Sequence, residues 1–130
     1  MTSTKHEVVS APGLPKPVGP YSPAMKLESL LFVSGQAATD PATGKQAEGI
    51  EAQTEQVLRN LERILVAGGS SLQHVLRCGV FLTDMKDFRR MNAVYERVFA
   101  GHRPARTTVQ VSALPDEGLM VEIDCVAYVP

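Results

Sequence analysis

The chain has 130 residues, 44% of them hydrophobic, which suits one domain with a modest core and excludes a disordered segment. Its 13 basic and 14 acidic residues give a net charge of −1 with no block of like charge, so a nucleic-acid partner is not indicated. No apolar run approaches a membrane span, and the polar start of the chain is unlike a secretory signal. We therefore expect residues 1–130 to form one soluble, cytoplasmic domain with no membrane contact.

The first third of the chain predicts short strands around a proline-rich loop. Residues 5–10 are compatible with a strand, whereas five prolines exclude helix and central strand from residues 11–23. The apolar run at residues 30–33 predicts a second strand. Residues 40–45 have the composition of a turn.

Two amphipathic helices follow. Residues 49–67 carry apolar side chains at spacings of three and four, and Gly68-Gly69 ends this helix. Asp84 is placed to cap a second helix over residues 85–99. The apolar stripe of the second helix comprises Phe88, Met91, Val94, Tyr95 and Val98.

Three further strands complete the prediction. Residues 75–82 are apolar on both alternating faces apart from Arg77, which is typical of a strand covered on both sides. The last two strands are joined by a turn rich in proline and glycine. Arg106, Thr108 and Gln110 share one face of the first, and Glu122 and Asp124 share one face of the second, opposite Val121, Ile123, Cys125 and Ala127.

A single arginine and a single glutamate in these last strands have two interpretations. Arg106 offers a rigid fork of donors that matches a planar carboxylate, so the pair with Glu122 suggests a small site for an anion. The same residues also fit a cross-strand ion pair that has no function. The sequence pattern by itself leaves both interpretations open.

The element order predicts an α+β fold, a mixed β-sheet with two helices packed on one face. Two helices cover only one face, and the other face still carries apolar strand residues. In so short a chain we expect another copy of the same chain to bury that face, which predicts a homo-oligomer without fixing the number of subunits.

Neither a metal nor a cofactor is indicated. His6, His74 and His102 lack the spacing of metal ligands. Cys78 and Cys125 lie in apolar strand-like runs, which predicts buried, reduced thiols and not nucleophiles. An enzyme built from this chain would act by positioning a substrate and a water molecule.

Seven segments occur in an order that is highly specific when they are taken together. They are Gly19-Pro20-Tyr21-Ser22, Ser34-Gly35-Gln36, the helix from Gln53 to Gly69, Val80-Phe81-Leu82-Thr83-Asp84-Met85, Met91-Asn92-Ala93-Val94-Tyr95, Arg103-Pro104-Ala105-Arg106, and Leu114-Pro115 with Val121-Glu122-Ile123. In these segments the chain resembles the reactive intermediate deaminase (Rid or YjgF-type) family over nearly its whole length.

The resemblance implies a chorismate-mutase-like fold and a homotrimer with a barrel core and three clefts between subunits. It also implies a 2-iminobutanoate/2-iminopropanoate deaminase that needs no cofactor and limits metabolite damage. The substrates would be 2-aminoacrylate and 2-aminocrotonate with their imine tautomers, 2-iminopropanoate and 2-iminobutanoate. The products would be a 2-keto acid and ammonia.

The resemblance also implies roles for seven residues. Arg106 would bind the substrate carboxylate and Glu122 would orient the attacking water. The cleft would be lined by Tyr21, Ser34 and Asn92, with the backbone of Gly35 and Thr108 in contact with the substrate or its nitrogen. Many members have cysteine at the position of Thr108, so any role of a thiol is lost here. We expect activity to survive, because the chemistry relies on Arg106 and backbone groups.

Two other functions compete with this one. The first is a non-catalytic small-molecule-binding or chaperone-like homotrimer that uses the same cleft between subunits. The second is an RNA-directed activity, which the near-neutral charge and the lack of a histidine acid–base pair disfavour. The physiological substrate stays open, because related deaminases of pyrimidine or aromatic breakdown would share these motifs.

Overall fold

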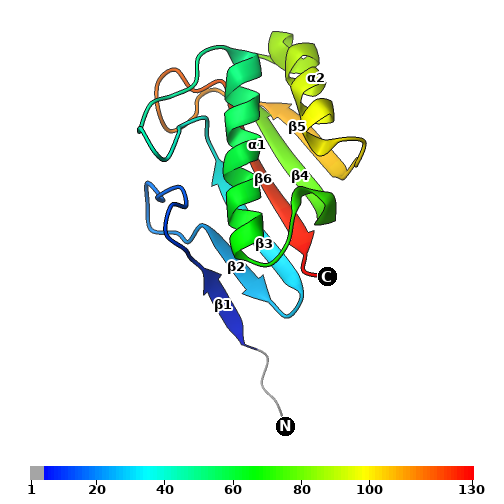
Figure 1. Ribbon diagram of the computed structural model, residues 1–130. Coiled ribbons are helices and arrows are strands. Elements are labelled where there is room, and N and C mark those ends of the chain that lie inside the picture. The colour runs from blue at the N-terminus through cyan, green and yellow to red at the C-terminus, as the bar shows by residue number, and fades with distance from the viewer. Residues whose placement is uncertain (1–4) are drawn as a thin grey trace.

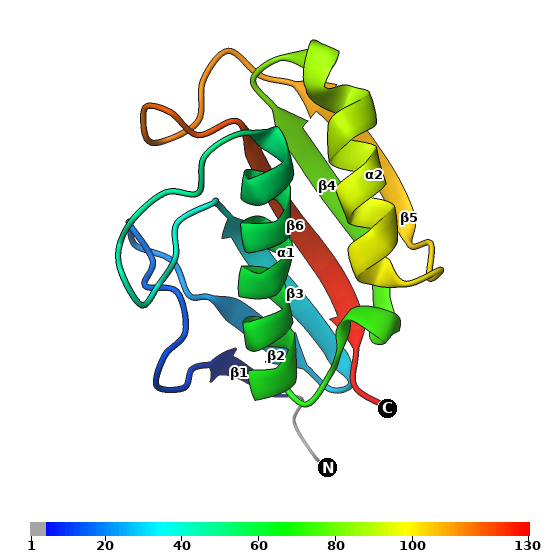
Figure 2. The same cartoon turned by 45° about the horizontal axis from the view of Figure 1, so that its top comes forward.

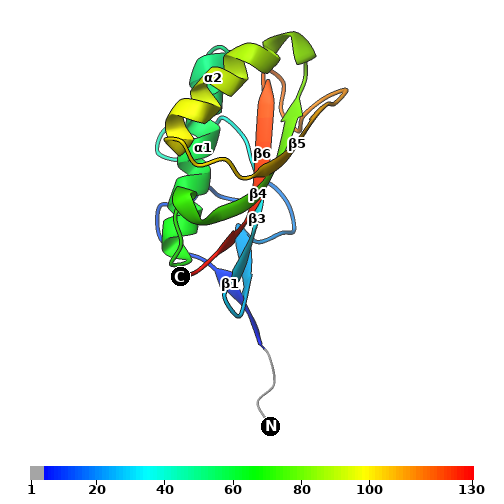
Figure 3. The same cartoon turned by 90° about the vertical axis from the view of Figure 1, so that its right-hand side faces the viewer.

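A computed structural model describes residues 5–130, which form a six-stranded sheet with both helices on one face (Figures 1 and 3). This arrangement confirms the predicted α+β fold. In chain order the elements are β1 (His6–Val9), β2 (Ala24–Leu27), β3 (Leu30–Gln36), α1 (Ile50–Ala67), β4 (Val75–Leu82), α2 (Phe88–Phe99), β5 (Ala105–Gln110) and β6 (Val121–Tyr128). Short 3₁₀ turns at Leu72–His74 and Met85–Asp87 precede β4 and α2.

The strand order in the sheet is β1-β2-β3-β6-β4-β5. Every pairing is antiparallel except that of β4 with β5, whose parallel crossover is made by α2 (Figure 2). The last strand, β6, therefore lies between β3 and β4. It is not adjacent to β5, although β5 precedes it directly in the sequence. Since β4 stands between them, the cross-strand ion pair of Arg106 with Glu122 is wrong.

Glycines with positive φ mark both ends of α1, and a capping side chain precedes α2. Gly49, with φ 85°, precedes α1, and Gly69, with φ 87°, turns the chain away after it while the Ser70 N–H donates to the Leu65 carbonyl. The Asp84 side chain accepts the Lys86 N–H, as a cap should. That first turn is 3₁₀, so the α-helix begins at Phe88 and not at residue 85.

The core lies between the two helices and the sheet. Leu58, Leu61, Ile64 and Leu65 of α1 are buried against the strands, as the periodicity predicted. Cys78 and Cys125 face each other across β4 and β6, both buried and without a disulfide.

On the opposite face of the sheet, here called the open face, no helix lies among residues 5–130 (Figure 3). It follows from the register that Leu30 and Phe32 of β3, Val109 of β5 and Tyr128 of β6 point there, and each is more than a third exposed. The interpretation of β4 as covered on both sides is therefore wrong for one chain. Strand β2 was also missed by the sequence analysis, and β3 extends three residues beyond Val33 to Gln36. Within residues 5–130, neither helix is both long and apolar enough to cross a membrane.

Candidate active site

Arg106 lies on the edge strand β5 and directs its side chain beneath α2. Its Nη2 donates to Asn92 Oδ1 at 2.7 Å, and its guanidinium carbon lies 4.7 Å from the centre of the Tyr95 ring and 5.7 Å from that of Phe88. These three residues share one face of α2 because they are spaced by four and three. Asn92, which the family resemblance placed in the cleft lining, thus lies in direct contact with the guanidinium of Arg106.

A hollow of about 370 Å³ opens beside this guanidinium. Glu96 lines it but pairs with the exposed Arg103 at 3.0 Å. His102 also lines it, with Nε2 donating to the Val75 carbonyl at 2.7 Å. Among residues 5–130 no carboxylate forms an ion pair with Arg106, so most of its donors are available to a ligand.

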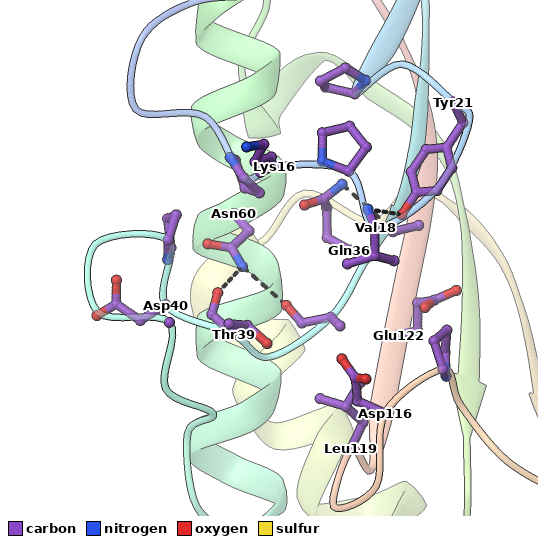
Figure 4. Close-up of a pocket in the computed structure, with 18 residues that line it drawn as sticks. Lys16, Val18, Tyr21, Gln36, Thr39, Asp40, Asn60, Asp116, Leu119 and Glu122 are labelled. Atoms are coloured by element: carbon purple, nitrogen blue, oxygen red, sulfur yellow. Dashed lines mark hydrogen bonds between the residues drawn. The ribbon is translucent and has the colours of Figure 1, made fainter.

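Glu122 lies on the central strand β6 and packs its side chain over the backbone of Gly35. A Cβ atom added at Gly35 would meet Glu122 Oε2 at 2.6 Å and Cγ at 3.2 Å, so a side chain at this position of β3 would displace the Glu122 carboxylate. Tyr21, Gly35 and Glu122 all line a cavity of about 270 Å³. Figure 4 shows Tyr21 and Glu122 along one side of it, with Asp40 and Asn60 along the other.

The loop that carries Tyr21 is held by two hydrogen bonds. The Tyr21 hydroxyl accepts the Val18 N–H at 3.3 Å, and Ser34 Oγ donates to the Ser22 carbonyl at 2.7 Å. Ser34 therefore ties the loop to β3, close to Gly35 and Glu122. Its hydroxyl is engaged with backbone and does not line the cavity.

Two polar residues of the cavity wall escaped the sequence analysis. Asn60 is 1% exposed, and its Nδ2 donates to the carbonyls of Ala37 at 3.0 Å and Thr39 at 2.9 Å, which shapes the loop after β3. Gln36 is also buried, and its Nε2 donates to the Ser34 and Gly35 carbonyls. The available signal for Asn60 was an amide within the apolar stripe of a helix, since buried polar groups need partners.

Burial raises the pKa of the Glu122 carboxyl, and the negative charge of Asp124 raises it further. No arginine or lysine within residues 5–130 lowers this pKa in return. A half-buried carboxylate without a cation has a pKa moved toward neutrality, where a general base is most effective.

Arg106 and Glu122 belong to opposite faces of the sheet. Arg106 is in register with Cys78, which is in register with Cys125, and both cysteines are buried beneath the helices. Glu122 is displaced from Cys125 by three residues and therefore points to the open face. One chain therefore does not by itself bring the two predicted catalytic residues, Arg106 and Glu122, together.

Six of the seven predicted residues thus divide into two groups, and Thr108 stands apart from both. Tyr21, Ser34, Gly35 and Glu122 gather around β3 and β6, whereas Asn92 and Arg106 gather beneath α2. Thr108 shares the face of Arg106, in register with the buried Val80, and lines neither cavity. Within the described part of the chain, no cluster of three or more His, Cys, Asp and Glu side chains could hold a metal ion.

Comparison with known proteins identifies the family. The family model described as Endoribonuclease L-PSP matches residues 12–129, so the chain belongs to this family. Reactive intermediate deaminases are among its relatives: a chloroplastic Reactive Intermediate Deaminase A of Arabidopsis thaliana is 43% identical, over 97% of this chain and 67% of that protein. The 2-iminobutanoate/2-iminopropanoate deaminase of Mus musculus is 38% identical, over 98% of this chain and 94% of that protein. Protein DfrA of Myxococcus xanthus is 51% identical, over 87% of this chain and 88% of that protein.

Solved structures give the same assignment. RidA from the Antarctic bacterium Psychrobacter sp. is 40% identical and superposes with a TM-score of 0.90, over 95% of this chain and 99% of that chain. TdcF of E. coli, solved with bound serine, is 34% identical with a TM-score of 0.89, over 94% of this chain and 98% of that chain. The fold is that of the Rid proteins.

Proposed function

We propose that this protein is a Rid-type hydrolytic deaminase of reactive enamine and imine acids, with 2-iminopropanoate, 2-iminobutanoate and their enamine tautomers as substrates. The relatives named as deaminases support the reaction class. The serine held by TdcF supports a ligand of the size of a small amino acid.

One observation carries the proposal: each half of the expected site lacks what the other half offers. Among the described residues Arg106 pairs with no carboxylate, and the half-buried carboxylate of Glu122 pairs with no cation. We infer that the working site lies between copies of the chain, with Arg106 and Asn92 from one and Tyr21, Gly35 and Glu122 from the next.

The open face gives a physical reason for such an assembly. It exposes the large apolar side chains of Leu30, Phe32 and Val109, and apolar side chains left exposed on one face of a sheet favour an interface. We propose a homotrimer in which the open faces pack into a barrel core. A closed ring of copies uses the same two surfaces of every subunit and therefore repeats the site at each junction.

The proposed chemistry needs positioning and one proton acceptor. Arg106 binds the substrate carboxylate with two parallel hydrogen bonds. Glu122 orients a water molecule and accepts its proton as the water oxygen bonds to the carbon of the protonated imine, whose C=N electron pair moves to the nitrogen. The Glu122 carboxyl then returns this proton to the amine nitrogen of the carbinolamine. The carbon–nitrogen bond breaks to release ammonia, and the hydroxyl group loses its proton to Glu122 or water as the carbon–oxygen double bond of the 2-keto acid forms. An enamine enters the same path after a proton is added to its β-carbon, which converts it into the protonated imine.

The alternative is a homotrimer that binds small acids in the same cleft without turnover, or that holds other proteins. No contact in the structure favours it over hydrolysis, since the carboxylate with a raised pKa is suited to a base. The near-neutral charge and the engagement of His102 with a backbone carbonyl also give no support to an activity on RNA.

An assay with substrate made in place tests the proposal. A threonine dehydratase releases 2-aminocrotonate from threonine, and the decay of the enamine and imine is followed with and without the protein. We expect the protein to accelerate the formation of 2-oxobutanoate and ammonia in proportion to its concentration. A decay rate unchanged at any protein concentration, with 2-oxobutanoate still bound, would instead establish the non-catalytic alternative.

A further inference from the structure

Side chains of α2 hold the guanidinium of Arg106 in place, and the importance of this for substrate binding rests on the proposed function. Helix α2 presents two aromatic rings and one amide toward this side chain. Tyr95 lies 4.7 Å and Phe88 5.7 Å from the guanidinium carbon, measured to the ring centres, and Asn92 Oδ1 accepts from Nη2 at 2.7 Å.

These contacts restrain different motions of the guanidinium. A cation close to the centre of an aromatic ring is attracted by the negative charge of the ring face. The amide of Asn92 fixes one of the five N–H donors and so restrains rotation about the side-chain axis. The other donors stay available for a bidentate contact with a carboxylate, since ring faces accept none of them by a conventional hydrogen bond.

Tyr95 is itself held firmly. It is 8% exposed, and its ring packs on that of the fully buried Phe99 with 4.6 Å between the ring centres. Its hydroxyl is buried and has no hydrogen-bond partner among the described residues. The hydroxyl therefore contributes nothing to holding Arg106, and it faces the buried thiol of Cys78 instead. The ring is the part of Tyr95 that acts on the arginine.

We propose that Tyr95 is a positioning residue whose ring face, aided by Phe88, holds the Arg106 guanidinium in the orientation that receives the carboxylate of an imino or 2-oxo acid. Tyr95 touches neither the substrate nor the reacting atoms in this account. It acts through Arg106, so its loss weakens binding of the acid and not the chemical step.

Three variants test this in the full-length protein. Tyr95→Phe keeps the ring and removes the hydroxyl, whereas Tyr95→Leu keeps apolar bulk and removes the ring. Val94→Ala is the matched control, because Val94 is buried in the same helix and has no aromatic ring to offer Arg106. The readouts are the dissociation constant for 2-oxobutanoate by calorimetry, KM and kcat with 2-aminocrotonate made in place, and the melting temperature.

We expect Tyr95→Leu to raise the dissociation constant and KM roughly 3- to 30-fold with kcat within about twofold of wild type. Tyr95→Phe should keep the dissociation constant at its wild-type value. Val94→Ala should lower the melting temperature without changing the dissociation constant. Equal weakening by Tyr95→Leu and Val94→Ala would overturn the proposal, because loss of helix packing would then explain both. Unchanged binding in Tyr95→Leu would overturn it as well.

Arg106→Ala separates this proposal from the proposed function. If Arg106→Ala leaves 2-oxobutanoate binding unchanged, the carboxylate role of Arg106 fails, and the role of Tyr95 fails with it. If Arg106→Ala weakens binding and Tyr95→Leu does not, only the positioning role is wrong.

Discussion

Arg106 and Glu122 point to opposite faces of one sheet, although only fifteen residues separate them in the sequence. The guanidinium lies beneath α2 and the carboxylate lies over Gly35 on the open face. A site that uses both groups therefore has to be assembled from more than one chain.

Replacement of Arg106 should abolish deamination. Loss of one partner of a buried charged contact costs about 2–5 kcal/mol, or roughly 30- to 4,000-fold in kcat/KM. Arg106→Lys should also fail, because an ammonium cannot make the two-pronged contact. Arg103→Ala is the matched control, since Arg103 lines the same hollow but pairs with Glu96 at the surface. Steady-state rates decide; an Arg106→Ala variant as active as Arg103→Ala would sink the carboxylate role.

Glu122→Gln should slow turnover while raising stability at neutral pH. A carboxyl with a raised pKa binds its proton more tightly in the folded chain, so its ionised form destabilises the fold. The penalty is present above the raised pKa and absent below the ordinary value of 4.5. Melting temperatures should therefore favour Glu122→Gln at neutral pH and converge with wild type near pH 4. A gap that widens on acidification would contradict this.

Gly35→Ala should reduce kcat through Glu122. The added methyl would lie 2.6 Å from Glu122 Oε2 and 3.2 Å from Cγ, so the carboxylate has to leave its place over the strand. We expect a fall of about ten- to a hundredfold in kcat, the scale of a misplaced catalytic group. Binding of 2-oxobutanoate to Arg106 should change little. Wild-type kcat in this variant would show that the position of Glu122 over Gly35 is unimportant.

Phe32→Asp should break the assembly. Phe32 is 46% exposed on the open face, and burying a carboxylate at an interface costs several kcal/mol. Light scattering after size exclusion should give about three times the 14.1 kDa chain mass for wild type and a single chain for the variant, which should also be inactive. Val66→Asp is the control, because Val66 is exposed on α1, away from the sheet. A monomeric wild-type protein would refute the shared site.

The sequence predicted the local elements well and their pairing poorly. Periodicity located α1 and β4, since both carry their burial pattern within one segment. It could not reveal that β6 lies between β3 and β4, because the order of strands depends on contacts between distant segments. Strand β2 was missed because its four residues follow a proline-rich loop and show too short a pattern.

The same distinction applies to the site. The alternation of β5 and β6 correctly placed the faces of Arg106 and Glu122 within each strand. The relation between the two faces required the register of β4 with both strands. The sequence also could not predict the contact of the Tyr95 ring with Arg106, because its spacing places Tyr95 simply in the apolar stripe of a helix.

The most direct test of a site shared between chains mixes two inactive variants. Arg106→Ala and Glu122→Gln chains are unfolded together in equal amounts, refolded, and assayed against each parent treated alone. Each site then receives an intact arginine from one chain and an intact glutamate from another with a probability of about one quarter. We predict recovery of about one quarter of wild-type activity. Activity no higher than that of the parents, with mixed oligomers demonstrated by mass spectrometry, would contradict the account.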